Sequence, residues 1–222
     1  MNNYYKQPKI VVWIESIFLL LIGIVLGILI IVKGNDNGIY YLGFFLYVPV
    51  SQFLFTPIYT LTGGYTYYSP MLLGYMANDT QIDLHSGTSF DHLFVLRKYP
   101  LGTPLRNRIL LYHLEGLLRL IQLIEEKRIP ESVNIVGTSY FFNDRTLLKL
   151  GFQIEKASVF YRINLLINGI DLFWMYSLSQ GKLAIPTLWD AKKASIQGNQ
   201  LVQSKPKLHA LYQHLQAKQA KL

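Results

Sequence analysis

Residues 10–32 read IVVWIESIFLLLIGIVLGILIIV, an apolar run interrupted only by Glu15, Ser16 and two glycines. At 1.5 Å per residue, a helix of this length crosses a hydrocarbon layer of roughly 30 Å. A cleaved signal peptide would instead have an apolar region of only about 7–15 residues and a small-residue cleavage site. The run therefore predicts a retained transmembrane helix near the amino terminus.

A second apolar segment follows a short polar turn. Lys33 to Gly38 are polar turn formers, and the chain from Ile39 to about Tyr59 is again apolar and aromatic. Two such segments predict an α-helical membrane hairpin, which we place at residues 1–62 and expect to contact the lipid bilayer. Polar residues within the second segment favour packing against the first helix, a protein partner or a second copy of the chain.

Charge is distributed unevenly between the hairpin and the rest of the chain. The formal net charge is +8, and 18 of the 21 lysines and arginines follow residue 60, against 11 of the 13 acidic residues. Basic residues on both outer flanks of the hairpin predict that the two termini and the soluble domain are cytoplasmic. The basic excess fits anionic lipid, a phosphate ligand or nucleic acid. Nucleic acid fits least, because the basic residues are scattered.

The absence of cysteine excludes disulfides, thiolate nucleophiles and zinc sites of the cysteine type. The remaining candidate metal ligands are Asp83, His85, Asp91 and His92, which lie close together in the sequence. Residues 83 and 85 share a face of a strand, whereas 91 and 92 point to opposite faces, so only one of the latter two can join the first two. Because such Asp and His residues are usually hydrogen-bonded turn residues, we predict no metal site here.

Residues 63–204 predict a soluble α/β domain with a mixed sheet. Turn signals divide residues 66–96 into two or three antiparallel strands, of which the last, Phe90 to Leu96, is continuously apolar and therefore expected to be central and buried. A long helix is expected from Thr103, as N-cap, to about Lys127.

The second half of this domain is expected to add two more strands around a short helix. Ser132 to Val136 predicts a strand, with its turn at residues 137–139. Asn143 then caps a short helix that Gly151 ends, before a strand at 152–157.

Two further helical segments are expected near the carboxyl terminus. Residues 161–178 form either a core helix or one lying against the membrane, because polar residues interrupt them too often for a third crossing. Residues 205–222 predict a basic amphipathic helix, which binds anionic lipid or a partner groove, or docks on its own domain.

The order of these elements resembles part of a known fold. Phe94-Val95, a basic loop, a long helix, the strand from Val133 to Val136 and the closing run Leu147-Leu148-Lys149-Leu150-Gly151-Phe152 resemble the C-terminal half of the GCN5-related N-acetyltransferase (GNAT) fold, over roughly residues 82–157. In that family the loop after the central strand binds the pyrophosphate of acetyl-CoA. The resemblance therefore implies an acetyl-CoA or other acyl-CoA site at Arg97, Lys98, Gly102, Thr103 and Arg106.

The resemblance implies an acyl-CoA-dependent N-acyltransferase, or a protein that binds acyl-CoA or another phosphate ligand. Asp91 is then the candidate general base, because a carboxylate beside a buried apolar run can have its pKa raised toward neutrality. Tyr140 is the candidate proton donor. The alternative is a catalytically inactive, membrane-tethered interaction or scaffold protein, in which Asp91 is a turn residue and Tyr140 a packed aromatic.

Overall fold

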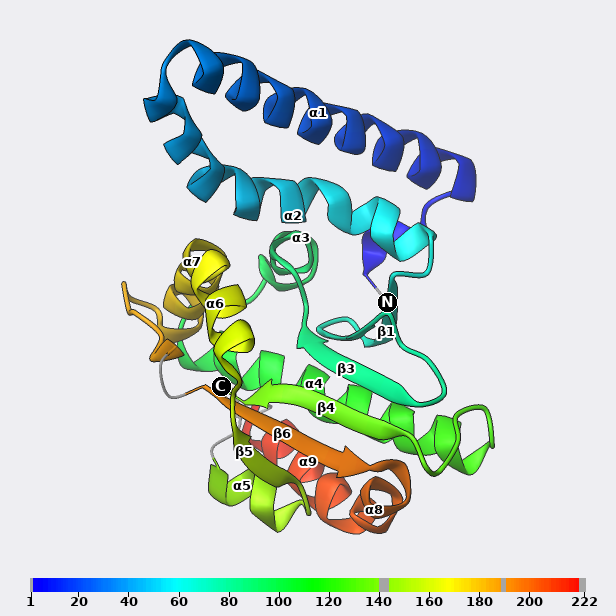
Figure 1. Cartoon of the computed structure of the whole chain (residues 1–222). Helices are drawn as coiled ribbons and strands as arrows, with labels where there is room; N and C mark the ends of the chain where they lie inside the picture. Colours follow the sequence, from blue (N-terminus) through cyan, green and yellow to red (C-terminus); the bar gives the residue numbers. More distant parts are fainter. Residues whose placement is uncertain (1, 140–143, 189–190, 220–222) are drawn as a thin grey trace.

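A computed structural model describes residues 2–139, 144–188 and 191–219, and it places a two-helix hairpin on one side of an α/β domain (Figure 1). A 3-10 turn, η1 (Asn3–Lys6), precedes α1 (Lys9–Asp36); a second 3-10 turn, η2 (Gly38–Gly43), then leads into α2 (Phe44–Leu61). Both long helices are apolar and long enough to cross a membrane, so the two predicted helices are confirmed as helices.

The two hairpin helices approach closely because glycines of α1 face aromatic rings of α2. A Cβ atom added at Gly23 would lie 2.3 Å from Cε1 of Phe55, and one added at Gly27 would lie 2.9 Å from the hydroxyl of Tyr47. The Tyr47 hydroxyl also donates to the carbonyl of Gly23 at 3.0 Å. Small residues at such a contact let helix backbones pack tightly within a hydrocarbon environment.

The domain is built on a mixed six-stranded sheet with the order β1-β2-β3-β4-β6-β5. The strands are β1 (Tyr65–Ser69), β2 (Leu72–Tyr75), β3 (Gln81–Ser86), β4 (Asn134–Ser139), β5 (Gln153–Lys156) and β6 (Lys192–Gln197). Strands β3 and β4 are parallel, and the other described neighbours are antiparallel. The prediction of a turn at residues 137–139 was wrong, because β6, which the sequence did not indicate, pairs with β4 as far as Ser139.

One face of the sheet is covered by α4 (Thr103–Glu125), α5 (Asp144–Lys149), α8 (Gly198–Gln203) and α9 (Lys205–Gln219) (Figure 1). Leu114, Leu120 and Ile121 of α4 are fully buried in the resulting core. The basic tail helix α9 packs on this core through the buried Leu208. Of the alternatives for the tail, docking on its own domain is therefore the one observed.

The predicted central strand at Phe90 to Leu96 was wrong, because this segment is helical. It forms α3 (Ser89–Asp91) and a π-helical turn, η3 (His92–Leu96). Thr88 and Asp91 form a capping box, in which each side chain bonds the backbone N–H of the other residue, and this arrangement starts a helix. An apolar run of this length does not by itself distinguish a buried strand from a buried helix.

The long helix α4 was predicted correctly, but Thr103 is not its N-cap. Thr103 is the first helical residue of α4, and the N-cap is Gly102, whose φ of +84° is a conformation that residues with a side chain rarely adopt. The short helix α5 ends, as expected, before Gly151, which has a φ of +89°.

The helices α6 (Val159–Ile167) and α7 (Gly169–Gln180) lie beside the hairpin, to the left of β1–β3 in Figure 1. On the face of β1 that points away from the core, Tyr67 contacts Tyr5 of η1 and Asp91 of α3. The segment from 161 to 178 is thus two helices that meet at Asn168 rather than one. Asn168 accepts a hydrogen bond from the Gln52 side chain of α2, which links the hairpin to this pair of helices.

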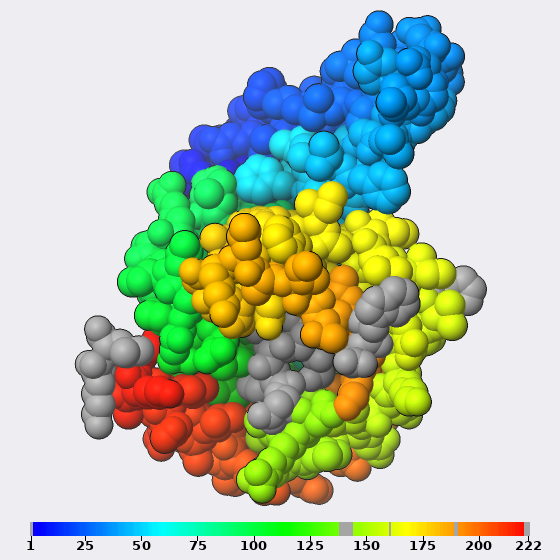
Figure 2. Space-filling model, turned by 90° about the vertical axis from the view of Figure 1, so that its left-hand side faces the viewer, coloured from blue at the N-terminus to red at the C-terminus, as the bar shows by residue number. Residues whose placement is uncertain are grey.

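A second set of contacts joins the hairpin to the domain. Phe90 of α3 is fully buried with Tyr4 and Val12 from the start of the chain, and Phe53 of α2 packs against them. The Thr56 hydroxyl of α2 also lies 3.1 Å from that of Thr88. We call these contacts, together with the Gln52–Asn168 bond, the joint. Beyond the joint, the tip of the hairpin stands clear of the domain (Figure 2).

Candidate functional site

A cavity of about 370 Å³ lies at the joint, between the sheet, the hairpin and the α6–α7 pair. Its floor is the face of β1–β3 that points away from the core, because side chains alternate between the two faces of a strand. Tyr65 is paired with Tyr75 across β1 and β2, and Leu73 with His85 across β2 and β3, so these four side chains share that face. The volume is typical of sites that bind small molecules.

The walls of the cavity come from segments distant in the sequence. The α6–α7 pair contributes Tyr161, Asn164, Asn168 and Asp171, and α2 contributes Gln52. Most of these side chains carry hydroxyl or amide groups, which can donate or accept hydrogen bonds without carrying a charge. The hairpin therefore completes a wall that is otherwise formed by the domain.

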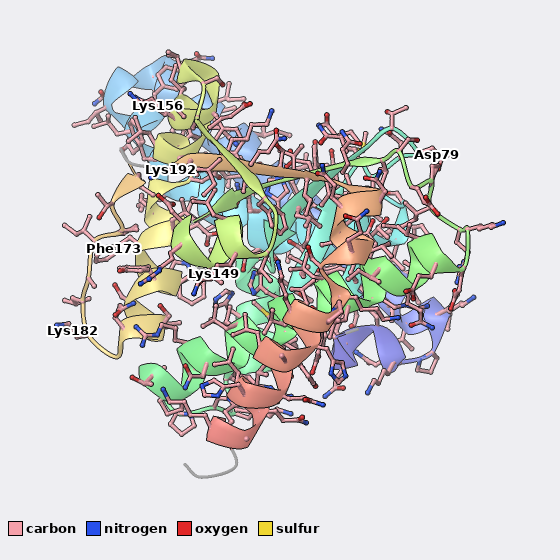
Figure 3. All side chains as sticks on the ribbon, turned by 90° about the horizontal axis from the view of Figure 1, so that it is seen from below. Asp79, Lys149, Lys156, Phe173, Lys182 and Lys192 are labelled. Carbon is pink, nitrogen blue, oxygen red and sulfur yellow. The ribbon has the colours of Figure 1, made fainter. Side chains whose placement is uncertain are left out.

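Electrostatically, the cavity differs from the rest of the domain. None of the described side chains that line it is a lysine or arginine. Its one acidic residue, Asp171, is buried, which raises the pKa of its carboxyl, and Trp174 donates to that carboxylate at 2.8 Å. Basic residues of the domain such as Lys149, Lys156 and Lys192, labelled in Figure 3, are not among the residues that line the cavity.

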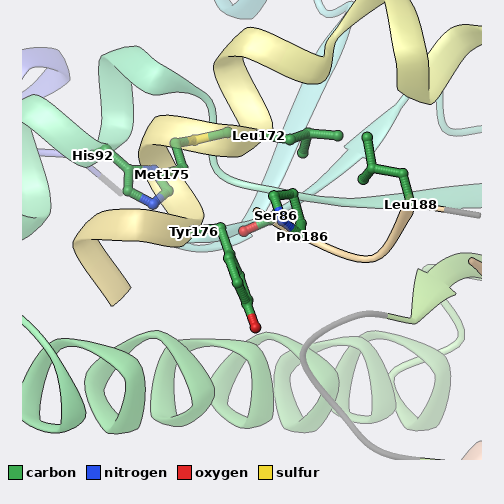
Figure 4. Close-up of a pocket in the computed structure, with 7 residues that line it drawn as sticks. All are labelled: Ser86, His92, Leu172, Met175, Tyr176, Pro186 and Leu188. Carbon is green, nitrogen blue, oxygen red and sulfur yellow. The ribbon is translucent and has the colours of Figure 1, made fainter. Parts of the chain in front are cut away.

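A much smaller pocket adjoins the cavity and shares Ser86, Leu172 and Met175 with it (Figure 4). Its volume of about 10 Å³ is that of roughly one water molecule. The Ser86 hydroxyl and Nε2 of His92 are buried, and neither has a hydrogen-bond partner in the described part of the chain. Both side chains line the small pocket, which has room for about one water molecule, and only Ser86 also lines the cavity.

His92 is held as a neutral ring. Burial lowers the pKa of His92 to about 4, and its Nδ1 lies 3.2 Å from the carbonyl of Thr88. Because a carbonyl only accepts, Nδ1 carries the proton and Nε2 is left as an acceptor.

Asp91, the candidate general base, lies outside both hollows and is fully buried. Its Oδ1 accepts from the Asn2 side chain at 3.2 Å. Its Oδ2 accepts from the Tyr67 hydroxyl at 2.8 Å, and from the amide and hydroxyl of Thr88 at 2.9 and 3.1 Å. Burial raises the pKa of Asp91 to about 6, against the effect of these hydrogen bonds. The carboxylate thus fixes the amino terminus to the capping turn and has no open path to a substrate.

The acyl-CoA residues implied by the resemblance lie around the start of α4. Arg97, Lys98, Thr103 and Arg106 are exposed, whereas Gly102 is buried. The Gly102 amide donates to the carbonyl of Leu178 at 3.0 Å, and Gly181 packs directly against the Gly102 backbone. The end of α7 therefore occupies the position where a pyrophosphate would have to approach this amide.

The other predicted site residues are not brought together. Tyr140 lies outside the described residues. Among the candidate metal ligands, Nε2 of His85 lies 3.5 Å from Oδ2 of Asp83 on β3. Asp91 instead accepts a hydrogen bond from Tyr67, and His92 lines the small pocket. The sequence reasoning missed Gln52, Asn164 and Asn168, and their polar character within apolar segments was the signal that could have found them.

In the comparisons with known proteins, no family model, curated protein or solved structure matches this chain. The function proposed below therefore rests on the hairpin and the cavity.

Proposed function

We propose that this protein is anchored in a membrane by the α1–α2 hairpin and binds a small polar molecule in the cavity at the joint. The observation that carries the proposal is the position of the cavity, whose wall is completed by Gln52 of the hairpin. A site built partly from an anchoring helix is held at the membrane surface wherever that helix is inserted.

The exposure of the hairpin supports the anchoring role. Only 17% of the most apolar window of α1 and 6% of that of the second segment are buried, whereas the core helix of a soluble protein would be mostly buried. The 28 residues of α1 extend about 42 Å, enough to cross a hydrocarbon layer of roughly 30 Å. Water would solvate this apolar surface poorly, so lipid is its expected surrounding.

Charge supports one orientation of the hairpin. Lys6 and Lys9 lie on the side of the joint, and Lys33 at the tip is paired with Asp36 at 3.8 Å. With the net basic domain on the same side as Lys6 and Lys9, the positive-inside rule favours a cytoplasmic domain and two cytoplasmic termini.

The absence of native cysteine makes this orientation testable with single-cysteine variants. We expect Gly38→Cys at the tip to react with an impermeant maleimide added outside intact cells, and Asn199→Cys on α8 to react only after permeabilisation. Labelling of both from the same side would contradict a spanning hairpin, and release of the protein from membranes by alkaline carbonate would contradict anchoring altogether.

The cavity is testable with the same chemistry. Ser86→Cys places a thiol at the inner end of the cavity, and Asn199→Cys serves as the exposed control. Because the described lining carries no lysine or arginine, an uncharged thiol reagent should react with Ser86→Cys faster than an anionic reagent of similar size. If the ratio of the two rates, uncharged reagent over anionic reagent, were the same for Ser86→Cys and Asn199→Cys, the cavity would not select against anions.

Acyl-CoA binding at Arg97 and Arg106 stays a separate prediction. Calorimetric titration of acetyl-CoA into the full-length protein tests it, with an Arg97→Ala, Arg106→Ala variant as control. Saturable binding that the variant loses would favour the acyltransferase hypothesis. No heat at millimolar ligand would leave the cavity, or a scaffold role without a small ligand, as the remaining functions.

A further inference from the structure

Helix α6 carries an apolar stripe on its outer surface. It consists of Val159, Ile163, Leu166, Ile167 and Ile170 just beyond its end, whose exposed fractions run from 40% to 71%. Their spacing places them on one side of the helix, whereas Leu165 on the opposite side is buried. Single exposed apolar residues are ordinary, but a continuous stripe marks a surface that contacts lipid or a partner.

This α6 stripe borders the opening of the cavity. Asn164 and Tyr75 are the lining residues with the most exposed positions, so they mark the rim. Asn164 lies on α6 between Ile163 and Ile167 of the stripe. A molecule that enters the cavity from the rim therefore passes along the α6 stripe.

The inner part of the cavity suits a head group that has hydroxyls and no charge. The Ser86 hydroxyl has no hydrogen-bond partner in the described chain. The side-chain amides of Gln52, Asn164 and Asn168 also line the cavity, and they bond one another, because Gln52 donates to Asn168 and Asn168 donates to Asn164 at 3.1 Å. A hydroxyl can still bond the amide oxygen of Gln52 and the amide nitrogen of Asn164, whose other side-chain atoms make these bonds. An anionic head would find no lysine or arginine among the described lining residues. Burying a charge without a partner is strongly unfavourable, whereas hydroxyls can be satisfied by the amides and hydroxyls present.

We propose that the cavity binds the uncharged, hydroxylated head of a membrane amphiphile, with the hydrocarbon chain lying along the α6 stripe. This inference rests on the proposed function, because the hairpin must hold the α6 stripe at the bilayer. The chain of the ligand supplies apolar burial, and the polar cavity selects the head. A monoacylglycerol is the simplest molecule of this class.

The test measures protection of Ser86→Cys in the full-length protein, reconstituted in phosphatidylcholine nanodiscs. Monooleoylglycerol is compared with oleate and lysophosphatidate, which share its chain but carry an anionic head, and with free glycerol, which shares its head but has no chain. Labelling by an uncharged maleimide should slow about tenfold at a monooleoylglycerol concentration about ten times its Kd, since the rate falls as 1 + [L]/Kd. Asn199→Cys should be unaffected.

The outcomes separate this inference from the proposed function. Protection by all three chain-bearing molecules would show unselective partition, and protection by glycerol at the same concentration would show a soluble polyol site; either would overturn the amphiphile. No protection by monooleoylglycerol would also overturn it, while the impermeant labelling of Gly38→Cys would still decide the anchoring role independently. An Asn164→Leu variant removes the rim amide and the side-chain bond from Asn168, but keeps the bond from Asn168 to the Asn164 backbone carbonyl; it should weaken protection while keeping the hairpin topology.

Discussion

Two buried histidines should make the protein less stable in mild acid, and replacing them should reverse the sign of the effect. Burial lowers the pKa of both His92 and His113 from 6.5 to about 4. Unfolding therefore takes up protons as the pH falls below 6.5, so the stability that each histidine contributes is lost as the pH falls toward its folded pKa. Between pH 7 and pH 5 each histidine should lower the free energy of unfolding by about 2 kcal/mol.

Asp91 acts in the opposite direction. Its pKa is raised from 3.8 to about 6, so its contribution is greatest below 3.8 and is lost as the pH rises through 6. Through Asp91, acidification from pH 7 to pH 5 should therefore raise the free energy of unfolding by about 1 kcal/mol. The raised pKa of Asp171 acts in the same direction as that of Asp91. The wild-type protein should lose roughly 2–3 kcal/mol over this interval.

The perturbation is the double substitution His92→Asn, His113→Asn. Nδ1 of His92 donates to the carbonyl of Thr88 at 3.2 Å, and Nδ1 of His113 donates to that of Ile109 at 2.7 Å. The side-chain amide of asparagine can replace this donor. Urea unfolding in detergent micelles, followed by tryptophan fluorescence, should show the variant gaining about 1 kcal/mol from pH 7 to pH 5 where the wild type loses stability. An equal loss in both proteins would refute the reasoning, and each single variant should fall between them.

Three further substitutions test the packing. Gly116→Ala should destabilise the domain by about 1–3 kcal/mol in urea, because the added Cβ would lie 2.8 Å from Cβ of Leu72; Gly38→Ala, with open space around it, is the matched control and should change little. Phe90→Ala should lower the free energy of unfolding by roughly 3–5 kcal/mol and expose the amino-terminal segment to protease. Unchanged stability and protease resistance would show that the joint does not stabilise the protein. Ser204→Ala removes a buried 2.6 Å hydrogen bond and should cost about 1 kcal/mol, so an unchanged unfolding midpoint would count against that bond.

The elements that the sequence predicted well are those whose pattern is long and local. The hairpin and α4 extend over many turns, and glycines such as Gly151 mark helix ends through their backbone conformation. The segment from Phe90 to Leu96 was predicted wrongly because an apolar run of seven residues is too short for its periodicity to distinguish a helix from a strand. In the helical turns that form, Leu93 and Phe94 are exposed, whereas Phe90, Val95 and Leu96 are buried. The four residues Thr88-Ser89-Phe90-Asp91 contained the missing signal, a capping box before an apolar run.

The candidate site was harder to predict because it has no local signature. The cavity joins Gln52 to strand residues near 65–86 and to helix residues near 161–175, so it depends on tertiary packing rather than on a motif. Asp91 was correctly predicted to have a raised pKa, but the contacts with Asn2 and Tyr67 that bury it come from residues far away in the sequence. The resemblance to acetyltransferases depended on a strand at Phe94-Val95, where the chain is helical.

The joint fixes the hairpin to the domain at two places, through Tyr4 and Phe90 at one and through Gln52 and Asn168 at the other. A helix held at a single point could pivot freely, but one held at two points transmits its tilt. Hydrophobic mismatch tilts membrane helices when the bilayer is thinner than the apolar segment. If the hairpin spans a bilayer as proposed, a change in bilayer thickness would move Gln52 relative to Asn168 and alter the shape of the cavity, so the binding site would respond to the thickness of the membrane.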